Sequence, residues 1–235
     1  MPAPQPEDTY VSEDNKLKIA VLGGTGDLGW GLALQFAKAG HPVTIGSRKA
    51  DKGIAAAAEL LEAAPGVEAH GTDNAQAAAW ADVVILTVPY AHQQSTLATI
   101  RDQVQGKIFV DSTVPLMPPK VMRVQLPEGG SAAKQTQDFL GEKVRVVSAF
   151  QNIAAAHLRS GKQDEEECDV LVCGNDPEAR QVVIDLAQAI GLKAWHAGAI
   201  DNSAVAEGLT SILIFLNKKY KIDGAGIRIT GHVGS

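Results

Sequence analysis

Two hydrophobic patterns alternate along this chain. Short runs of consecutive apolar residues, many of them β-branched, predict buried strands, and stretches with apolar residues every three or four positions predict helices. Strands are expected at residues 18–22, 42–45, 83–87, 108–111, 144–148, 170–173 and 193–196. Helices are expected from residue 28 to Gly40 and at 51–63, 76–80, 92–104, 132–140, 177–189 and 203–219. This alternation predicts an α/β fold, with a mostly parallel sheet covered by helices on both faces.

A glycine-rich turn joins the first predicted strand to the first predicted helix. Gly24, Gly26 and Gly29 form a Gly-x-Gly-x-x-Gly pattern directly after the apolar run 18–22. In that context, backbone N–H groups and the helix N-terminus form a cradle for a dinucleotide pyrophosphate. Asp27 is expected to cap the helix, with its carboxylate turned toward free N–H groups and away from phosphate. The pattern therefore predicts a Rossmann-type doubly wound sheet that binds a dinucleotide, with a small C-terminal helical extension.

The end of the second predicted strand indicates which dinucleotide. Proteins that bind NAD usually carry Asp or Glu about 20 residues after the glycines, to accept hydrogen bonds from the ribose hydroxyls. This chain has Ser47 and Arg48 there, followed by Lys49 and Lys52. A hydroxyl and a guanidinium suit a 2′-phosphate dianion, so the predicted cofactor is NADP(H). The alternative is that Arg48 and Lys52 only solvate the start of an alanine-rich helix.

Length and composition agree with one large domain plus a small appendage. The chain has 235 residues, of which 45% are hydrophobic, and a formal net charge of −6. This charge argues against nucleic acid or an anionic membrane as a partner. We expect a flexible leader at residues 1–15, an NADP-binding Rossmann domain at 16–150 and a smaller C-terminal region at 151–235.

Targeting segments and metal sites are not expected. Residues 1–15 contain three prolines and no apolar stretch, and the apolar run 212–216 is far shorter than the roughly 18 residues of a membrane span. Cys168 and Cys173 are too few for a disulfide framework or a four-ligand zinc site. We therefore predict a cytoplasmic protein with no metal and no membrane partner.

Six segments carry a resemblance to a known family. They include the doubled glycine before Thr25 and the Gly-Ser-Arg at residues 46–48. In this ordered set the chain resembles the NADPH:coenzyme F420 oxidoreductases, from about residue 18 to about residue 228. That family shares its fold with membrane-linked ferric reductases that use NADPH and flavin. The segments are residues 21–29, 45–48, 86–92, 147–152, 172–176 and 197–203.

The resemblance implies an NADP-dependent oxidoreductase with coenzyme F420 as its co-substrate. A hydride would pass reversibly between nicotinamide C4 of NADPH and C5 of the 5-deazaflavin. Both partners are cofactors, so the protein supplies stacking, orientation and water exclusion, and no acid or base is nominated as catalytic. By motif match, the implied cofactor-binding residues are Gly24, Thr25, Gly26, Asp27, Leu28 and Gly29 at the pyrophosphate, Ser47, Arg48 and Lys52 at the 2′-phosphate, Val88 and His92 at the adenosine or ribose, and Val114 and Ala155 at the nicotinamide. For His92 the alternative is a bond to its own helix backbone.

The deazaflavin side departs from the family pattern. Gln151, Asn152 and Ala225 are the implied F420-binding positions. Gln151 stands where the family usually has histidine, and Ala225 replaces a larger apolar residue. Gln151 can still donate a hydrogen bond to a ring carbonyl or phosphate, whereas Ala225 offers less surface to the ring.

Three further features each have two interpretations. The loop at residues 116–130 is either a lid or a plain connection, and the helix at 203–219 is either a homodimer and substrate element, as the family suggests, or an internal helix. A basic rim for the polyanionic F420 tail competes with scattered surface cations. Its candidates are Lys120, Arg123, Lys134, Arg159 and Lys162.

Two functional alternatives remain beside F420 reduction. One is an NADPH-dependent reductase of another acceptor, such as a flavin, a ferric ion through a flavin, or a small imine or keto compound. The other is a non-catalytic protein that binds NADP only to sense redox state.

Overall fold

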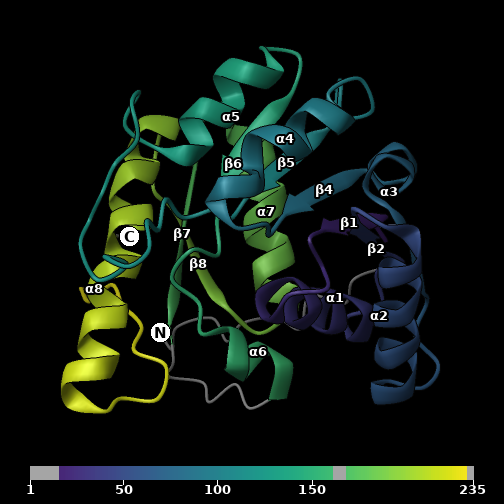
Figure 1. Ribbon diagram of the computed structural model, residues 1–235, viewed down its shortest axis with the longest axis horizontal. Helices are drawn as coiled ribbons and strands as arrows, with labels where there is room; N and C mark the ends of the chain where they lie inside the picture. Colours follow the sequence, from purple (N-terminus) through teal and green to yellow (C-terminus); the bar gives the residue numbers. More distant parts are fainter. Residues whose placement is uncertain (1–15, 161–167, 232–235) are drawn as a thin grey trace, which may run out of the picture.

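An eight-stranded sheet forms the centre of the molecule, and helices cover both of its faces (Figure 1). The computed structural model describes residues 16–160 and 168–231. The strands lie in the order β3-β2-β1-β4-β5-β6-β7-β8, and β6 and β7 are the antiparallel neighbours in an otherwise parallel sheet. The order of the first six strands is that of a doubly wound dinucleotide-binding fold, as the sequence predicts.

Each predicted strand is present, with ends that agree within two residues. The strands are β1 (Ile19–Leu22), β2 (Val43–Ser47), β3 (Ala69–Asp73), β4 (Val83–Leu86), β5 (Ile108–Asp111), β6 (Arg145–Ser148), β7 (Asp169–Gly174) and β8 (Lys193–His196). Every residue of β1, β4 and β5 is buried, which explains why these strands read as continuous apolar runs.

The helices divide between the two faces of the sheet. The apolar cores show that α1, α2, α6 and α7 cover one face and that α3, α4 and α5 cover the other. The helices are α1 (Asp27–Lys38), α2 (Ala50–Ala63), α3 (Asn74–Trp80), α4 (Tyr90–Ile100), α5 (Ala132–Leu140), α6 (Ala155–Ser160), α7 (Pro177–Ala189), the 3₁₀ turn η2 (Ile200–Asn202) and α8 (Ser203–Tyr220).

Beside the short 3₁₀ turn η2, the structure adds two elements that the sequence analysis did not predict, β3 and α6. It also moves one helix, because α4 begins at Tyr90 directly after Pro89 and ends at Ile100, whereas the pattern placed it at 92–104. The proposed leader at 1–15 and Lys162 lie outside the described residues.

The turn between β1 and α1 is packed so closely that it requires glycine. Gly23 has φ +80°, a left-handed conformation that a side chain disfavours. A Cβ on Gly29 would overlap Thr87 Oγ1 at the end of β4 and would lie 2.8 Å from Gly24 Cα. The absence of side chains here lets α1 start against the ends of β1 and β4.

The C-terminal part of the chain extends the same sheet. After β8 the chain forms α8, and the tail that follows returns to the start of β7. There Asp169 N donates to Ile227 O at 2.8 Å, and Ile229 N donates to Asp169 Oδ2 at 2.7 Å. Among the described residues no helix is long and apolar enough to cross a membrane.

Candidate functional site

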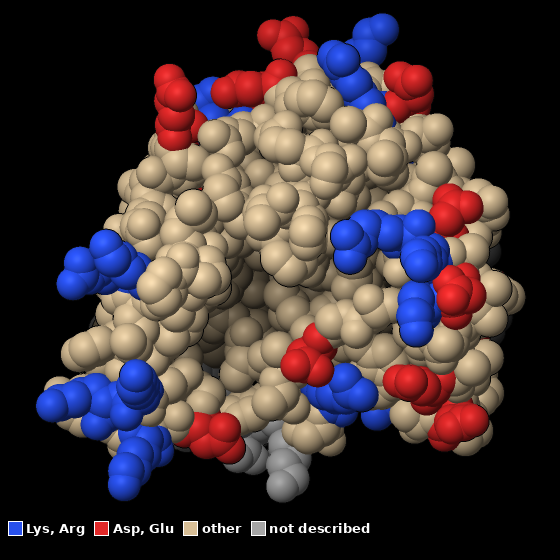
Figure 2. Space-filling view, in the orientation of Figure 1, with Lys and Arg blue, Asp and Glu red and all other residues tan. Residues whose placement is uncertain are grey.

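A large cleft opens at the carboxyl ends of β1, β2, β4 and β5, with a volume of about 1150 Å³. Figure 2 shows that the face viewed is hollowed near its middle. Carboxyl ends of parallel strands, at the point where the strand order reverses, are where doubly wound folds bind ligands. The sequence-predicted site residues that line the cleft are Thr25, Gly26, Asp27, Leu28, Ser47, Arg48, Lys52, Val88, His92 and Val114.

The start of α1 faces this cleft without a side-chain cap. The N-cap residue is Gly26, which has no side chain, so the first N–H groups of the helix remain for an anionic ligand. Gly24 and Gly29 do not line the cleft but pack the turn against β1, β2 and β4. Gly24 and Gly29 therefore allow the turn to pack closely, and Gly26 leaves the N-terminus of α1 open to the cleft.

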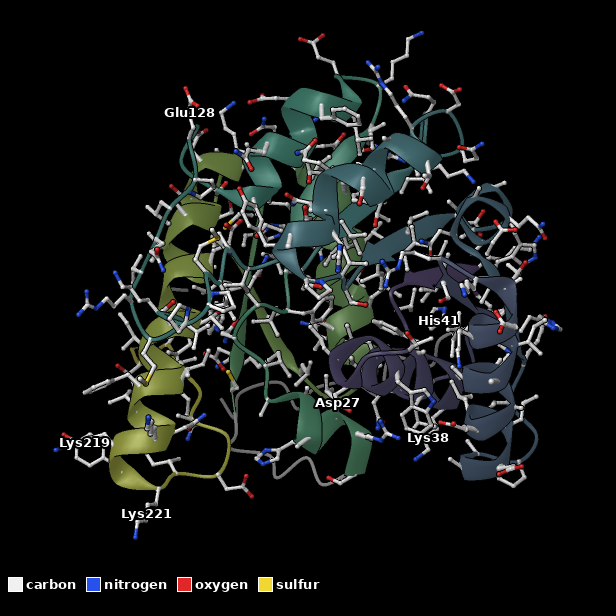
Figure 3. The ribbon with its side chains drawn as sticks, viewed as in Figure 1. Asp27, Lys38, His41, Glu128, Lys219 and Lys221 are labelled. Atoms are coloured by element: carbon white, nitrogen blue, oxygen red, sulfur yellow. The ribbon has the colours of Figure 1, made fainter. Side chains whose placement is uncertain are left out.

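The expected capping role of Asp27 is wrong. Asp27 lies in the first turn of α1, at the position labelled in Figure 3, and its side chain is 77% exposed. Its Oδ1 accepts a hydrogen bond from Arg159 at 3.1 Å. Arg159 also stacks over the ring of Trp30, with its Cζ 4.6 Å from the ring centroid. The carboxylate is thus drawn toward α6, which the sequence analysis did not predict.

Four polar or cationic side chains gather where β2 ends. Ser47, Arg48, Lys49 and Lys52 all line the cleft there, in the connection from β2 into α2. A fifth residue, Asn74, lines the same end from the start of α3. A cluster of this kind can hold an anion through a guanidinium, ammonium groups and neutral hydrogen-bond groups together.

The opposite wall comes from β4, α4 and the long connection after β5. His92 lies in the first turn of α4 and lines the cleft, and its backbone N donates to Pro89 O at 2.8 Å. Leu116, Pro118 and Val121, from the first part of the predicted loop 116–130, also line the cleft. This part of the loop therefore belongs to the site wall.

A buried network of polar side chains lies behind that wall, at the end of β5. Asp111 ends β5 and is fully buried, and its Oδ2 accepts from Gln93 Nε2 at 2.8 Å and from Thr136 Oγ1 at 2.6 Å. Its Oδ1 accepts from Thr113 N at 2.8 Å. These bonds fix the turn that presents the neighbouring Ser112 and Val114 to the cleft.

A second buried carboxylate, Glu207 of α8, caps the start of α5. It accepts from Ala132 N at 2.7 Å and from Ala133 N at 3.0 Å, and its side chain has no exposed surface. Burial raises the pKa of Glu207 to about 8, although the two N–H groups act in the opposite direction, and the nearby Asp111 adds to the rise. Sequence reasoning placed Glu207 only within an amphipathic helix.

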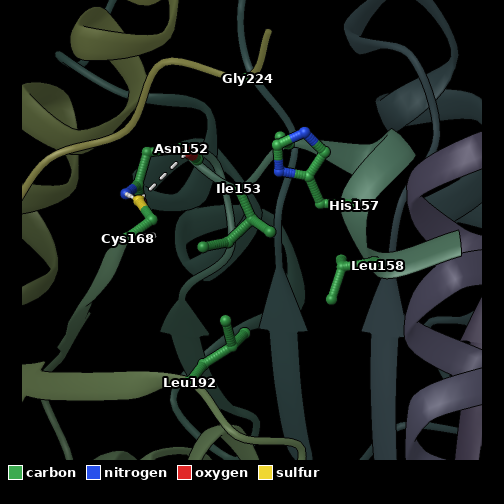
Figure 4. A pocket seen from close by; sticks show the side chains of 8 residues that line it. Asn152, Ile153, His157, Leu158, Cys168, Leu192 and Gly224 are labelled. Carbon is green, nitrogen blue, oxygen red and sulfur yellow. Dashed lines mark hydrogen bonds between the residues drawn. The ribbon is translucent and has the colours of Figure 1, made fainter. Parts of the chain in front are cut away.

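The residues implied for F420 turn their amides inward. Gln151 is 5% exposed, and its Nε2 donates to Asp111 O at 2.8 Å and to Ser148 Oγ at 2.7 Å. Figure 4 shows Asn152 beside Cys168. Its Nδ2 donates to Cys168 Sγ at 2.9 Å and to Asp169 O at 2.8 Å, next to a cavity of about 20 Å³.

The two implied alanines lie apart from the main cleft lining. Ala155 is the first residue of α6. Ala225 lies in the turn after α8, where its backbone N donates to Asn217 Oδ1 at 2.7 Å. Neither residue lines the large cleft.

Two cations of the candidate basic rim for the F420 tail already contact other side chains. Lys134 is held by Asp138 at 2.8 Å, and Arg159 is held by Asp27 and Trp30. Lys120 and Arg123 lie in the connection that follows β5, where part of the cleft wall is formed.

Comparison with known proteins identifies close relatives. A family model described as NADP oxidoreductase, coenzyme F420-dependent, matches residues 18–115. The F420-dependent NADP reductase of Methanocaldococcus jannaschii is 46% identical over 222 residues, which cover 91% of this chain and 98% of that protein.

Two further matches differ in how much of the matched protein they cover. A crystal structure assigned as an F420-dependent NADP reductase from Arthrobacter sp. FB24 superposes with a TM-score of 0.78 and 29% identity, covering 92% of this chain and all of that one. The metalloreductase STEAP3 of Rattus norvegicus is 27% identical, over 82% of this chain but only 36% of that protein. The similarity to the reductases spans whole proteins, whereas that to the metalloreductase spans a part.

Proposed function

Because the chain belongs to the family of coenzyme F420-dependent NADP oxidoreductases, we propose that it transfers a hydride reversibly between NADPH and oxidised coenzyme F420. The observation that carries this proposal is the near full-length match to F420-dependent NADP reductases at 42–46% identity. The shape and chemistry of the cleft agree with it.

The cleft fits NADP(H). The uncapped start of α1 would bind the pyrophosphate through the N–H groups of the turn that contains Thr25, Gly26, Asp27 and Leu28. A side chain at Gly23 or Gly29 would clash with the residues that follow β4, so this close packing fixes the turn whose N–H groups face the cleft. Ser47, Arg48 and Lys52 would hold the 2′-phosphate with charge-assisted bonds.

The two cofactors supply the redox chemistry, with the hydride passing between nicotinamide and deazaflavin. The protein's own residues bind, orient and exclude water. Val88, His92 and Val114 line the wall along which we place the ribose and nicotinamide, and the Asp111 network holds that wall rigid. Reacting carbons held at roughly 3–3.5 Å would account for most of the rate acceleration.

On the acceptor side, we propose that Gln151, Asn152 and Ala225 shape the F420 region, with Ala155 at the nicotinamide end of NADPH. The Gln151 and Asn152 amides donate to protein groups, so in this conformation they act by fixing the backbone after β6. Phe150, just before them, has φ +73°, an uncommon conformation for a residue with a side chain. A strained backbone held by buried amides suits a segment that must keep its shape beside a ligand.

An absorbance assay tests the proposal. Oxidised F420 absorbs visible light and its reduced form does not, so mixing the protein, NADPH and F420 should remove that absorbance as NADPH is consumed in equal amount. Reduction of free FMN in place of F420 would instead support a different acceptor. NADPH binding without turnover of any acceptor would support the redox-sensing alternative, and both results would contradict the proposal.

We also propose that the protein acts as a homodimer, as the resemblance implies. The supporting observation is an exposed apolar stripe on α8, where Val205 is 70% exposed and Ile212 and Phe215 are each 47% exposed. An exposed stripe of large apolar side chains on one helix is typical of an interaction surface.

A further inference from the structure

One side chain beside Ser47 and Arg48 has no cofactor contact assigned to it so far. Asn74 begins α3 directly after β3, lines the cleft, and is 6% exposed. Its Oδ1 is buried and has no hydrogen-bond partner among the described residues. A buried amide oxygen without a partner destabilises the folded protein, and an apolar side chain would avoid that cost.

The sheet places Asn74 beside the predicted phosphate-binding residues. In the parallel pairing of β2 and β3, Ser47 lies opposite Asp73. Asn74 is the next residue along, at the same edge of the sheet as Arg48. The two connections, from β2 into α2 and from β3 into α3, therefore bring Asn74 and Arg48 to one end of the cleft.

A glycine in β2 makes room for the amide. A Cβ on Gly46 would lie 3.0 Å from Asn74 Oδ1 and 3.2 Å from Ala77 Cβ. The Oδ1 side of the amide is thus packed against the β2 backbone just before Ser47. The Nδ2 group is therefore the atom of this side chain that can donate a hydrogen bond to a ligand.

We propose that Asn74 is a specificity-determining residue for NADPH, whose amide donates a hydrogen bond to the 2′-phosphate held by Ser47 and Arg48. This inference rests on the proposed use of NADPH. A neutral donor suits a dianion, and a carboxylate at the same place would repel it while accepting a hydrogen bond from the free ribose hydroxyl of NADH. The amide therefore favours the phosphorylated cofactor.

Two substitutions separate this role from a structural one. Asn74→Ala should raise KM for NADPH about 10-fold while kcat stays within about twofold, since the contact is remote from the reacting carbons. Asn74→Asp should shift the ratio of NADPH to NADH KM values by on the order of 100-fold toward NADH. Gln76→Ala is the matched control, because Gln76 is an exposed amide on the same helix that does not line the cleft.

A binding measurement without F420 makes the test independent of turnover. NADP+ should raise the melting temperature of the wild type and of Gln76→Ala equally, and should raise that of both Asn74 variants less. Equal NADP+ shifts in all four proteins, or a lower melting temperature for Asn74→Ala with an unchanged NADP+ shift, would overturn the inference and leave the proposed function intact. A wild type that binds no NADP(H) at all would overturn both.

Discussion

At the scale of single residues, charge at the end of β2 decides which cofactor the cleft can hold. A carboxylate there would accept hydrogen bonds from ribose hydroxyls, whereas this chain offers Ser47 and Arg48. Arg48 is exposed, so its guanidinium is already largely solvated and a phosphate must compete with water for it. Its contribution to binding should then be that of one charge-assisted contact.

Replacing Arg48 with alanine should therefore raise KM for NADPH by on the order of 10- to 100-fold, which corresponds to about 1.4–2.8 kcal/mol. KM for NADH should change much less, because NADH lacks the 2′-phosphate. Steady-state kinetics with both cofactors measure the difference. Lys38→Ala is the control, because Lys38 is an exposed cation at the far end of α1 (Figure 3). Unchanged NADPH kinetics in Arg48→Ala would remove this residue from the site.

Glu207 should make stability depend on pH. Its folded-state pKa is about 8 and its ordinary value is 4.5, so the folded protein keeps a proton that the unfolded chain releases between those values. The contribution is complete below about pH 4.5 and is lost as pH rises, at about 1.4 kcal/mol per pH unit, until about pH 8.

Urea unfolding across pH 5–8 tests this expectation. The difference in free energy of unfolding between the wild type and Glu207→Gln should fall with increasing pH, because glutamine does not titrate. A difference that stays constant would show that Glu207 is ionised in the folded protein throughout this range.

Single-residue roles were predictable where they follow from a local motif. The glycine-rich turn and the pair Ser47 and Arg48 were predicted from spacing, and Thr25 and Leu28 were implied by the family resemblance; Thr25, Gly26, Leu28, Ser47 and Arg48 line one cleft. Asn74 was not predicted, because its position depends on β3. Asp27 was misassigned because its partner, Arg159, is 132 positions away in the sequence.

At the scale of elements, the turn before α1 separates two kinds of glycine. Gly29 is needed for packing, because a Cβ there would overlap Thr87 Oγ1 and crowd Gly24. Gly26 has an ordinary extended backbone with φ −87°, and a Cβ there would meet only Gly23 O, at 3.6 Å. A side chain at Gly26 is therefore compatible with folding, but it would lie where the cofactor approaches.

Gly29→Ala should lower the free energy of unfolding by about 1–3 kcal/mol, the usual cost of forcing an atom into a packed interior. Gly26→Ala should change it by less than about 0.5 kcal/mol while weakening NADP+ binding, since its methyl group would face the ligand. Chemical denaturation and NADP+ titration of both variants measure these effects. Equal stabilities would mean that α1 can move away from β4 without cost.

The two elements that the sequence did not predict have weak local signals. β3 consists of Ala69, His70, Gly71, Thr72 and Asp73, which include a single β-branched residue, and it forms because β2 offers an unpaired edge. α6 has six residues, too few to be stable alone, and it packs against Gly31 of α1, where an added Cβ would lie 2.9 Å from Leu158 Cβ. Tertiary packing determines both elements.

At the scale of the whole molecule, one sheet connects the cofactor-binding half to the C-terminal part. β7 pairs antiparallel with β6, and the tail after α8 is hydrogen-bonded to Asp169 at the start of β7. Glu207 of α8 then caps α5, which follows the loop that lines the cleft. A contact made by α8 with another molecule would therefore act on the same body that forms the cleft wall.

The helix that carries the apolar stripe, α8, lies on one side of the molecule, and α2 and α3 lie on the other (Figure 1). Val124 packs beside Gly208 of this helix and is itself 46% exposed, which widens the apolar surface. If two copies associate through this surface, Phe215→Glu should place a buried, unpaired charge in the interface and convert the dimer to a monomer. Light scattering coupled to size-exclusion chromatography measures the mass directly.

The matched control for that experiment is Ile54→Glu, because Ile54 is a 57% exposed apolar residue on α2, on the opposite side. It should leave the mass unchanged. A dimer that persists in Phe215→Glu but is lost in Ile54→Glu would move the interface to α2, and a wild type that is monomeric at micromolar concentration would remove it altogether.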